Sequence, residues 1–394
     1  MESEVFDRPK IDVLVQALPP IPDAIGDYTV GFSSDLLRFF EVNIFTSSGF
    51  IPEALGSLSI TQPFELTGGG HRRFNGLFRL LVDSHSEVLL LQYNPFAWGK
   101  RGWAPDLPKL LRDVKRRKPQ LLITVMFHET FMLYPGLRYR IMRFYQERQF
   151  RKLLEVADLA FYSSSKWADQ HRSIGVDCSA LTLPVGSNLP LSQLDPHDAK
   201  RRLGFDDSDF VCSVFGGSHV SRMFDRVDVA VSAISKSFLG KRRTRLIYIG
   251  DSDRRWKVDD TAIHCLGRLS AQSAADAIAA SDLMINPFLD GISTRRGSAM
   301  AALQHGVPVL TTKGHNTEEV WGQESMRSVC MVDIAELDRI WSDNAARFAN
   351  QVSDSQGGMR WDITAFYRRN FDWPITTKLY ADKVMEHLMT KQVK

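Results

Sequence analysis

The densest group of residues able to do chemistry in this 394-residue chain lies between residues 287 and 298. It combines two adjacent arginines, two glycines and three hydroxyl side chains between a predicted strand and a predicted helix. Guanidinium groups and the N–H groups of a helix N-terminus can together hold a diphosphate. The spacing of a Walker loop is absent. The candidate diphosphate-binding residues of this segment are Gly291, Ile292, Ser293, Arg295, Gly297 and Ser298, and its candidate catalytic residues are Asp290 and Arg296. The alternative is a polar loop that binds nothing.

A second group follows the first predicted strand of the C-terminal half. Gly217 and Ser218 offer exposed backbone N–H groups, and Arg222 offers a planar guanidinium that can hold a phosphate through two hydrogen bonds. We therefore predict that these three residues bind phosphate. The alternative is a surface arginine beside an ordinary loop.

The N-terminal half has two weaker groups, each after an apolar run. Gly26, followed by Asp27 and Tyr28, permits a tight turn and close approach of a ligand to the backbone. His128 and Glu129 can orient a hydroxyl group or share a proton at the end of a buried strand. The alternatives are an ordinary strand-to-helix turn and a histidine satisfied by a backbone carbonyl.

Continuous apolar runs alternate with charged, helical segments along the whole chain, which is typical of a parallel sheet covered on both faces. The sequence predicts an α/β fold of two Rossmann-like, doubly wound domains facing a cleft. We assign residues 1–187 to an N-terminal domain, residues 188–373 to a C-terminal domain and residues 374–394 to a helix that crosses back. The predicted strands are 11–17, 42–45, 88–92, 121–127 and 159–162, then 210–215, 245–249, 263–266, 283–287 and 307–311. The predicted helices include 28–40, 137–156, 227–238 and 296–305.

Composition excludes several classes of protein. The net charge is only +3, from 49 basic and 46 acidic residues, so a general nucleic-acid coat is excluded. Four dispersed cysteines do not form a disulfide framework, and Cys212 and Cys265 lie in apolar runs, so both are expected to be buried thiols. Residues 1–9 lack the apolar core of a signal peptide. We expect a cytoplasmic protein.

The stretch from 105 to 155 is locally basic, with twelve lysines and arginines against five acidic residues and with aromatic residues between them. Such a face could contact an anionic membrane peripherally at the inner surface, or bind an anionic acceptor. The alternative is a solvated helix face whose apolar side lies in the core.

Five segments together resemble the retaining nucleotide-sugar glycosyltransferases of family 4, which have the GT-B fold. They are Ile25–Thr29, Leu91–Pro95, Phe127–Glu129, Leu183–Asn188 and Asp290–Thr312. The resemblance implies transfer of a sugar, with retention, from a nucleotide diphosphate sugar to an acceptor hydroxyl of a glycan, lipid-linked or small molecule. It implies a donor held by the C-terminal domain, an acceptor held by the N-terminal domain, and no metal or other cofactor.

Residues can be carried over by position in the family's motifs. Arg222 matches a phosphate-contacting lysine, His128 a histidine that contacts the donor sugar, and Gly26 a glycine loop near the diphosphate. The usual pair of glutamates is incomplete, because Asp290 stands near the first and Ala301 stands at the second. We therefore expect Arg222 and Arg296 to stabilise developing charge, His128 to position the sugar and Asp290 to bind its hydroxyls, with Asp27, Tyr28 and Glu129 on the acceptor side.

Two alternatives remain open. A chain that lacks the ribose-binding glutamate could be a non-catalytic, nucleotide-sugar-binding partner subunit. It could also be another nucleotide-sugar enzyme on the same fold, such as an epimerase.

Overall fold

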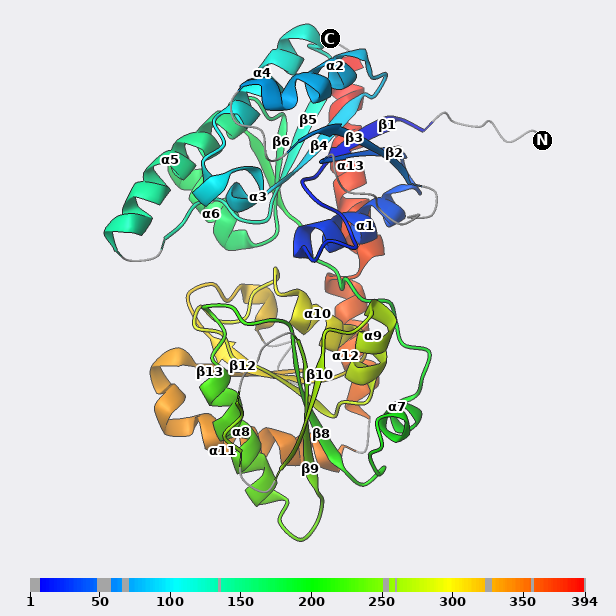
Figure 1. Cartoon of the computed structure of the whole chain (residues 1–394), viewed down its shortest axis with the longest axis vertical. Coiled ribbons are helices and arrows are strands. Elements are labelled where there is room, and N and C mark those ends of the chain that lie inside the picture. The colour runs from blue at the N-terminus through cyan, green and yellow to red at the C-terminus, as the bar shows by residue number, and fades with distance from the viewer. Residues whose placement is uncertain are drawn as a thin grey trace, which may run out of the picture. The chain divides into compact units, whose positions relative to one another are not determined.

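A computed structural model describes residues 8–47, 58–65, 71–133, 136–250, 255–258, 261–322, 328–355 and 358–392. The chain divides into two compact units (Figure 1). Unit 1 comprises Met1–Gly186 together with Trp373–Lys394, and unit 2 comprises Ser187–Asp372. The last helix therefore belongs to the unit that the chain forms first.

Unit 1 is built on a parallel sheet with the strand order β3-β2-β1-β4-β5-β6-β7. Its strands are β1 (Lys10–Leu14), β2 (Glu41–Ser47), β3 (Ser59–Phe64), β4 (Val88–Tyr93), β5 (Leu122–Phe127), β6 (Leu159–Tyr162) and β7 (Ser179–Thr182). Its helices are α1 (Ala24–Leu36), α2 (Asn75–Asp83), α3 (Pro95–Trp98), α4 (Asp106–Arg117), α5 (Leu137–Leu154), α6 (Ser165–Ile174) and α13 (Trp373–Gln392).

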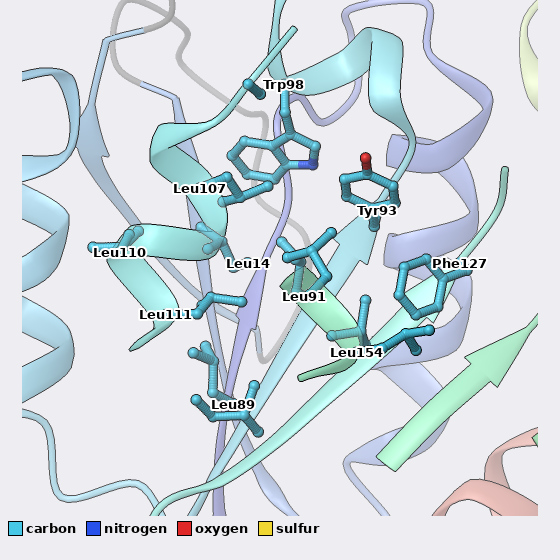
Figure 2. Close-up of a cluster of buried hydrophobic side chains, with 14 of the residues drawn as sticks. Leu14, Leu89, Leu91, Tyr93, Trp98, Leu107, Leu110, Leu111, Phe127 and Leu154 are labelled. Atoms are coloured by element: carbon cyan, nitrogen blue, oxygen red, sulfur yellow. The ribbon is translucent and has the colours of Figure 1, made fainter. Parts of the chain in front are cut away.

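The core of unit 1 forms where leucines of the central strands meet the apolar face of α4. Every residue of β4 and β5 is buried, as expected for strands covered on both faces. Figure 2 shows Leu89 and Leu91 of β4 beside Leu107 and Leu111 of α4. Burying a leucine side chain of this kind contributes about 1.5–3 kcal/mol to folding.

Unit 2 is built on a second parallel sheet, with the order β10-β9-β8-β11-β12-β13. Its strands are β8 (Phe210–Phe215), β9 (Thr244–Ile249), β10 (Ala262–Gly267), β11 (Leu283–Asn286), β12 (Val309–Lys313) and β13 (Val329–Asp333). Its helices are α7 (Pro196–Arg202), α8 (Phe224–Ser237), α9 (Ala271–Ala279), α10 (Gly297–Gln304), α11 (Leu337–Asp354) and α12 (Met359–Asn370).

Both sheets follow the strand order of a Rossmann fold, which confirms the prediction of two Rossmann-like, doubly wound domains. The order reverses between β1 and β4 in unit 1, and between β8 and β11 in unit 2. Ligands of open α/β sheets bind outside the carboxyl ends of the strands at such a point. The residues that follow these four strands are therefore the candidates for binding a ligand.

Some elements differ from the sequence-based expectation. Helix α1 begins at Ala24 rather than at residue 28, because Asp23 caps it. Cys212 is buried as expected, but the prediction for Cys265 was wrong: this thiol is exposed, because it lies on the edge strand β10. None of the helices in the described ranges is both long and apolar enough to span a bilayer. The sequence predicts no signal peptide in residues 1–9, and residues 1–7 of this stretch lie outside the described part of the chain.

Candidate functional site

The loops after β8 and β11 are joined into one structure at the point where the order of the second sheet reverses. Arg222 and Phe288 form an isolated antiparallel bridge. The N–H of Met223 donates to the carbonyl of Pro287 at 3.0 Å, and the N–H of Leu289 donates to the carbonyl of Ser221 at 2.7 Å. These bonds fix the position of the Arg222 side chain relative to the segment from 287 to 298.

Arg222 lies across the end of β8 in a largely buried position. Its Nη1 donates to Oδ1 of the buried Asn286 at 2.7 Å, and its guanidinium carbon lies 5.2 Å from the ring centroid of Phe288. Gly216 has a φ of +106°, and a Cβ there would lie 3.0 Å from Nη2 of Arg222. A glycine at this position thus allows both the turn and the close approach of the guanidinium.

The charge of Arg222 is not compensated by a carboxylate within the described residues. Burial and the nearby positive charge of Arg296 lower the pKa of Arg222 to about 10, which leaves it charged at neutral pH. Its buried Nε has no hydrogen-bond partner in the described part of the chain. A buried cation with an unsatisfied donor is costly unless an anion is bound.

Asp290 pairs with both arginines of the dense segment. Its Oδ1 lies 2.5 Å from Nη2 of Arg296, and its Oδ2 lies 3.1 Å from Nη2 of Arg295. Asn316 also donates to Oδ2, at 3.1 Å. Burial alone would raise the pKa of Asp290, but Arg296 and Arg295 hold it below its usual value. Asp290 therefore stays ionised and aligns the two guanidinium groups.

Arg296 brings the two loops into contact. Its Nη2 donates to Oγ of Ser221 at 3.2 Å, and its guanidinium carbon lies 4.1 Å from the ring centroid of Phe288. Arg222 and Arg296 thus share contact with one aromatic ring, although both carry positive charge. The structure thus brings three of the predicted catalytic residues together at the carboxyl ends of β8 and β11: Arg222, Asp290 and Arg296.

Two further sets of predicted donor-side residues lie within the loops themselves. Gly291, Ile292 and Ser293 are buried and line the inner side of the loop, where Gly291 has a φ of +84° and the N–H of Ile292 donates to the carbonyl of Thr312. Gly217 and Ser218 are exposed in the loop after β8.

Gly297 and Ser298 open helix α10, which has no side-chain cap. An uncapped helix N-terminus beside arginines is suited to an anion. In unit 1, the helix after the first strand is capped, because Asp23 at the start of α1 accepts from the N–H of Gly26 at 3.2 Å. A carboxylate therefore already occupies the N-terminus of α1, whereas no side chain among the described residues caps α10 beside Arg296.

In unit 1, His128 is packed against residues of two other elements. Its Nε2 lies 2.7 Å from Oε1 of Gln92 at the end of β4, and its ring meets the ring of Tyr28 edge-on at 4.7 Å. Because an amide oxygen only accepts, this contact places the proton on Nε2 and leaves Nδ1 as an acceptor. Burial lowers the pKa of His128 to about 3. The neutral ring can position a hydroxyl group but does not take up a second proton at neutral pH.

Asp27 and Glu129 have different surroundings. Burial, and secondly the neighbouring Asp23, raise the pKa of Asp27 to about 6. Glu129 accepts a hydrogen bond of 3.4 Å from Asn94, which caps α3. Gly26 lies inside α1 rather than in a loop, and a Cβ there would lie 2.6 Å from the carbonyl oxygen of Ala17. The close approach that Gly26 permits is therefore to the protein's own backbone at Ala17.

Four contributors were not predicted from the sequence: Gln92, Gly216, Asn286 and Phe288. Gln92 and Asn286 have a signal in the sequence, since each is a polar residue at the end of an otherwise apolar strand. Phe288 gives no such signal because its role depends on two arginines that approach it from different loops. Within the described ranges, no group of three or more metal-ligating side chains is present.

Comparison with known proteins shows similarity in fold. No family model matches the chain, and no curated protein matches its sequence. Sucrose-phosphate synthase from Thermosynechococcus elongatus is 12% identical, with 97% of this chain and 100% of that chain covered and a TM-score of 0.67. Anabaena HepE in complex with UDP-glucose is 14% identical, with 96% and 99% covered and a TM-score of 0.65. WaaG, a glycosyltransferase involved in lipopolysaccharide biosynthesis, is 14% identical, with 94% and 98% covered and a TM-score of 0.63. The likeness extends over nearly the whole of each chain and shows the GT-B fold.

Proposed function

We propose that this chain is a glycosyltransferase that moves a sugar from a nucleotide diphosphate sugar to an acceptor hydroxyl, with retention of configuration. The observation that carries the proposal is Arg222, a charged and largely buried guanidinium without a carboxylate partner in the described residues. It lies where a Rossmann-like sheet binds its ligand, beside Arg296 and the uncapped N-terminus of α10. A diphosphate has the charge and the acceptor oxygens that this place lacks.

The reaction would proceed without a metal ion. The bond between the anomeric carbon and the diphosphate oxygen breaks, and the acceptor oxygen bonds to that carbon on the same face. The departing diphosphate oxygen takes the acceptor's proton. Arg222 and Arg296 stabilise the charge that develops on the diphosphate, as preorganised donors do in other enzymes. His128, neutral and held by Gln92, accepts a hydrogen bond from a sugar hydroxyl.

The alternative of a non-catalytic nucleotide-sugar-binding subunit rests on one observation. Ala301, at the position of the family's second glutamate, is almost fully buried inside α10. No carboxylate can therefore contact a ribose from this position. A binding subunit would still bind the diphosphate but would not catalyse sugar transfer.

The experiment measures transfer and donor hydrolysis with UDP-, GDP- and ADP-sugars, beginning with UDP-glucose because the HepE structure holds it. We expect Arg222→Gln to lower kcat about 100- to 1,000-fold, which is the cost of losing one charge-stabilising donor. The matched control is Arg339→Gln, which alters an exposed arginine on α11 and should leave the rate unchanged. NMR of the anomeric proton in the product tests retention.

Three outcomes separate the hypotheses. Full turnover by a correctly folded Arg222→Gln variant would overturn the assignment. Nucleotide binding without hydrolysis or transfer for every donor would favour the binding subunit. A changed sugar recovered without added acceptor would favour an epimerase.

A further inference from the structure

Helix α5 (Leu137–Leu154), labelled in Figure 1, has an exposed apolar stripe as well as a buried one. Leu137, Ile141 and Phe144 are spaced by four and three residues, so they lie on one face of the helix. Their side chains are 73%, 58% and 59% exposed. An exposed row of large apolar side chains is a feature of interaction surfaces.

The opposite face of α5 packs in the core of unit 1. The exposed stripe is therefore not the face through which this helix packs on the rest of the unit. Phe150 and Leu153 are fully buried in the main hydrophobic cluster. Gln149 is buried and accepts from the N–H of Ala104 at 2.6 Å, while its Nε2 donates to the carbonyl of Gly102 at 2.7 Å. These contacts fix the rotation of the helix and keep the stripe turned outward.

Basic side chains surround the stripe. Helix α5 has six basic residues and one acidic residue, Glu147, which pairs with Arg143 at 3.4 Å. Arg148 lies over the ring of Phe144, with its guanidinium carbon 3.7 Å from the ring centroid. All six basic residues are exposed: Arg138, Arg140, Arg143, Arg148, Arg151 and Lys152.

An exposed tryptophan extends this surface. Trp103 is 55% exposed, and its ring meets the ring of Tyr145 edge-on at 5.2 Å. The turn before it is tied to α5, because the hydroxyl of Tyr145 donates to the carbonyl of Arg101 at 2.6 Å. Trp103 is thus held beside the stripe. Tryptophan prefers the boundary between lipid headgroups and acyl chains.

We propose that the exposed face of α5, together with Trp103, lies on an anionic lipid bilayer. An apolar stripe bordered by arginines and lysines is the pattern of helices that lie in a membrane interface. The apolar side chains enter the acyl boundary, and the basic groups meet the negative headgroups. The charge complementarity favours lipid over a protein partner, because the basic groups are spread along the whole helix rather than gathered at one point.

Vesicle flotation of the full chain tests this proposal. The probes are vesicles of phosphatidylcholine alone and vesicles in which phosphatidylglycerol replaces one-third of the lipid. We expect the chain to float with the anionic vesicles and to stay unbound with the neutral ones. Each basic residue near such a surface strengthens partitioning about fivefold, so Arg140→Gln/Arg148→Gln should weaken it about 25-fold. Ile141→Ser/Phe144→Ser should also release the protein, although its basic residues remain.

The matched control alters a comparable surface in unit 2. Leu239 is 85% exposed beside the exposed Lys241 and Arg242, so Leu239→Ser/Lys241→Gln/Arg242→Gln should bind vesicles as the parent chain does. Circular dichroism checks that all variants are folded. Equal recovery with neutral and anionic vesicles, no flotation of the parent chain, or unchanged flotation of both α5 variants would each overturn the proposal. None of the altered residues belongs to the proposed site, so failure here leaves the proposed function intact.

Discussion

At the scale of single residues, the candidate site is defined by ionisable groups whose surroundings oppose their usual state. Burial keeps His128 neutral, two arginines keep Asp290 charged, and burial beside Asp23 favours the protonated form of Asp27. Groups with shifted pKa values gather at functional sites. Each shift also has a consequence for stability, which can be measured without knowing the substrate.

Asp27→Asn tests the raised pKa of Asp27. The folded pKa is about 6 against 3.8 for an unperturbed carboxyl, so the carboxyl destabilises the fold increasingly as pH rises from about 4 to 6, and fully above that. The variant should therefore be more stable than the parent at pH 7, by about 1–2 kcal/mol once solvent screening of this partly exposed group is included, and equal to it below pH 4. Thermal unfolding across this pH range measures the difference. A constant difference at all pH values would contradict the assignment.

Asp290→Asn tests the arginine cluster. This change would leave Arg295 and Arg296 without their shared carboxylate, and breaking a buried ion pair of this kind costs about 3–5 kcal/mol. An added diphosphate would then supply the missing negative charge, so UDP should stabilise this variant more than it stabilises the parent chain. Melting curves with and without UDP measure both effects. Equal stabilisation of the two proteins would show that the diphosphate does not reach these arginines.

At the scale of elements, α13 completes unit 1. Tyr380 is fully buried, its hydroxyl lies 2.8 Å from Oγ1 of Thr124 on β5, and its ring meets that of Phe32 on α1. Trp373, at the start of the helix, lies beside two glycines. A Cβ at Gly186 would lie 2.6 Å from its ring, and a Cβ at Gly31 would lie 2.9 Å from it.

Gly186→Ala should therefore destabilise unit 1 by about 1–3 kcal/mol, because the ring of Trp373 cannot move away from Gly186 without meeting Gly31. Trp373→Phe should lower stability as well, through lost packing. The double variant should be more stable than the sum of the two changes predicts, because the smaller ring leaves room for the new methyl group. Urea unfolding of all four proteins gives the coupling energy, and an additive result would exclude the steric explanation.

The central strands could be predicted from the sequence, as could the edge strand β10, but the edge strands β3, β7 and β13 could not. β4 and β5 are buried at every position and largely apolar, because helices cover both of their faces. β3, β7 and β13 lie at the edges of their sheets and contain exposed or half-exposed residues. β3 and β7 therefore lack a continuous apolar run, and the run in β13 is short. The charged residues of the candidate site could also be predicted, because arginines beside glycines can be recognised in the sequence. The contact of Arg222 with Asn286 could not, because it depends on how the strands and loops pack.

At the scale of the whole molecule, the chain has two units of the same sheet order, and the candidate residues divide between them. Arg222, Asp290 and Arg296 lie in unit 2, while Tyr28, His128 and Glu129 lie in unit 1. If unit 2 holds the nucleotide diphosphate, changes in the two units should have different effects on ligand binding.

We therefore expect UDP to stabilise the parent chain and His128→Asn equally, and to have little effect on Arg222→Gln. A ligand at about 100 times its Kd adds about 2.7 kcal/mol to the free energy of unfolding. UDP-glucose should add stability beyond UDP in the parent chain and less in His128→Asn, since only the sugar would contact this histidine. Thermal-shift measurements distinguish these cases, with uridine as the control that lacks phosphate. Stabilisation by uridine as strong as that by UDP would exclude recognition of the diphosphate.

The return of the chain to unit 1 also bears on its biosynthesis. Residues 187–372 are synthesised before α13, so the whole sequence of the second unit is made while the first unit still lacks a helix. Until then, Phe32, Phe40 and Phe161 lack the ring of Tyr380 that packs on them in the finished protein. Unit 1 therefore needs the last residues of the chain to cover its aromatic side chains, and a chain truncated before residue 373 would leave them exposed.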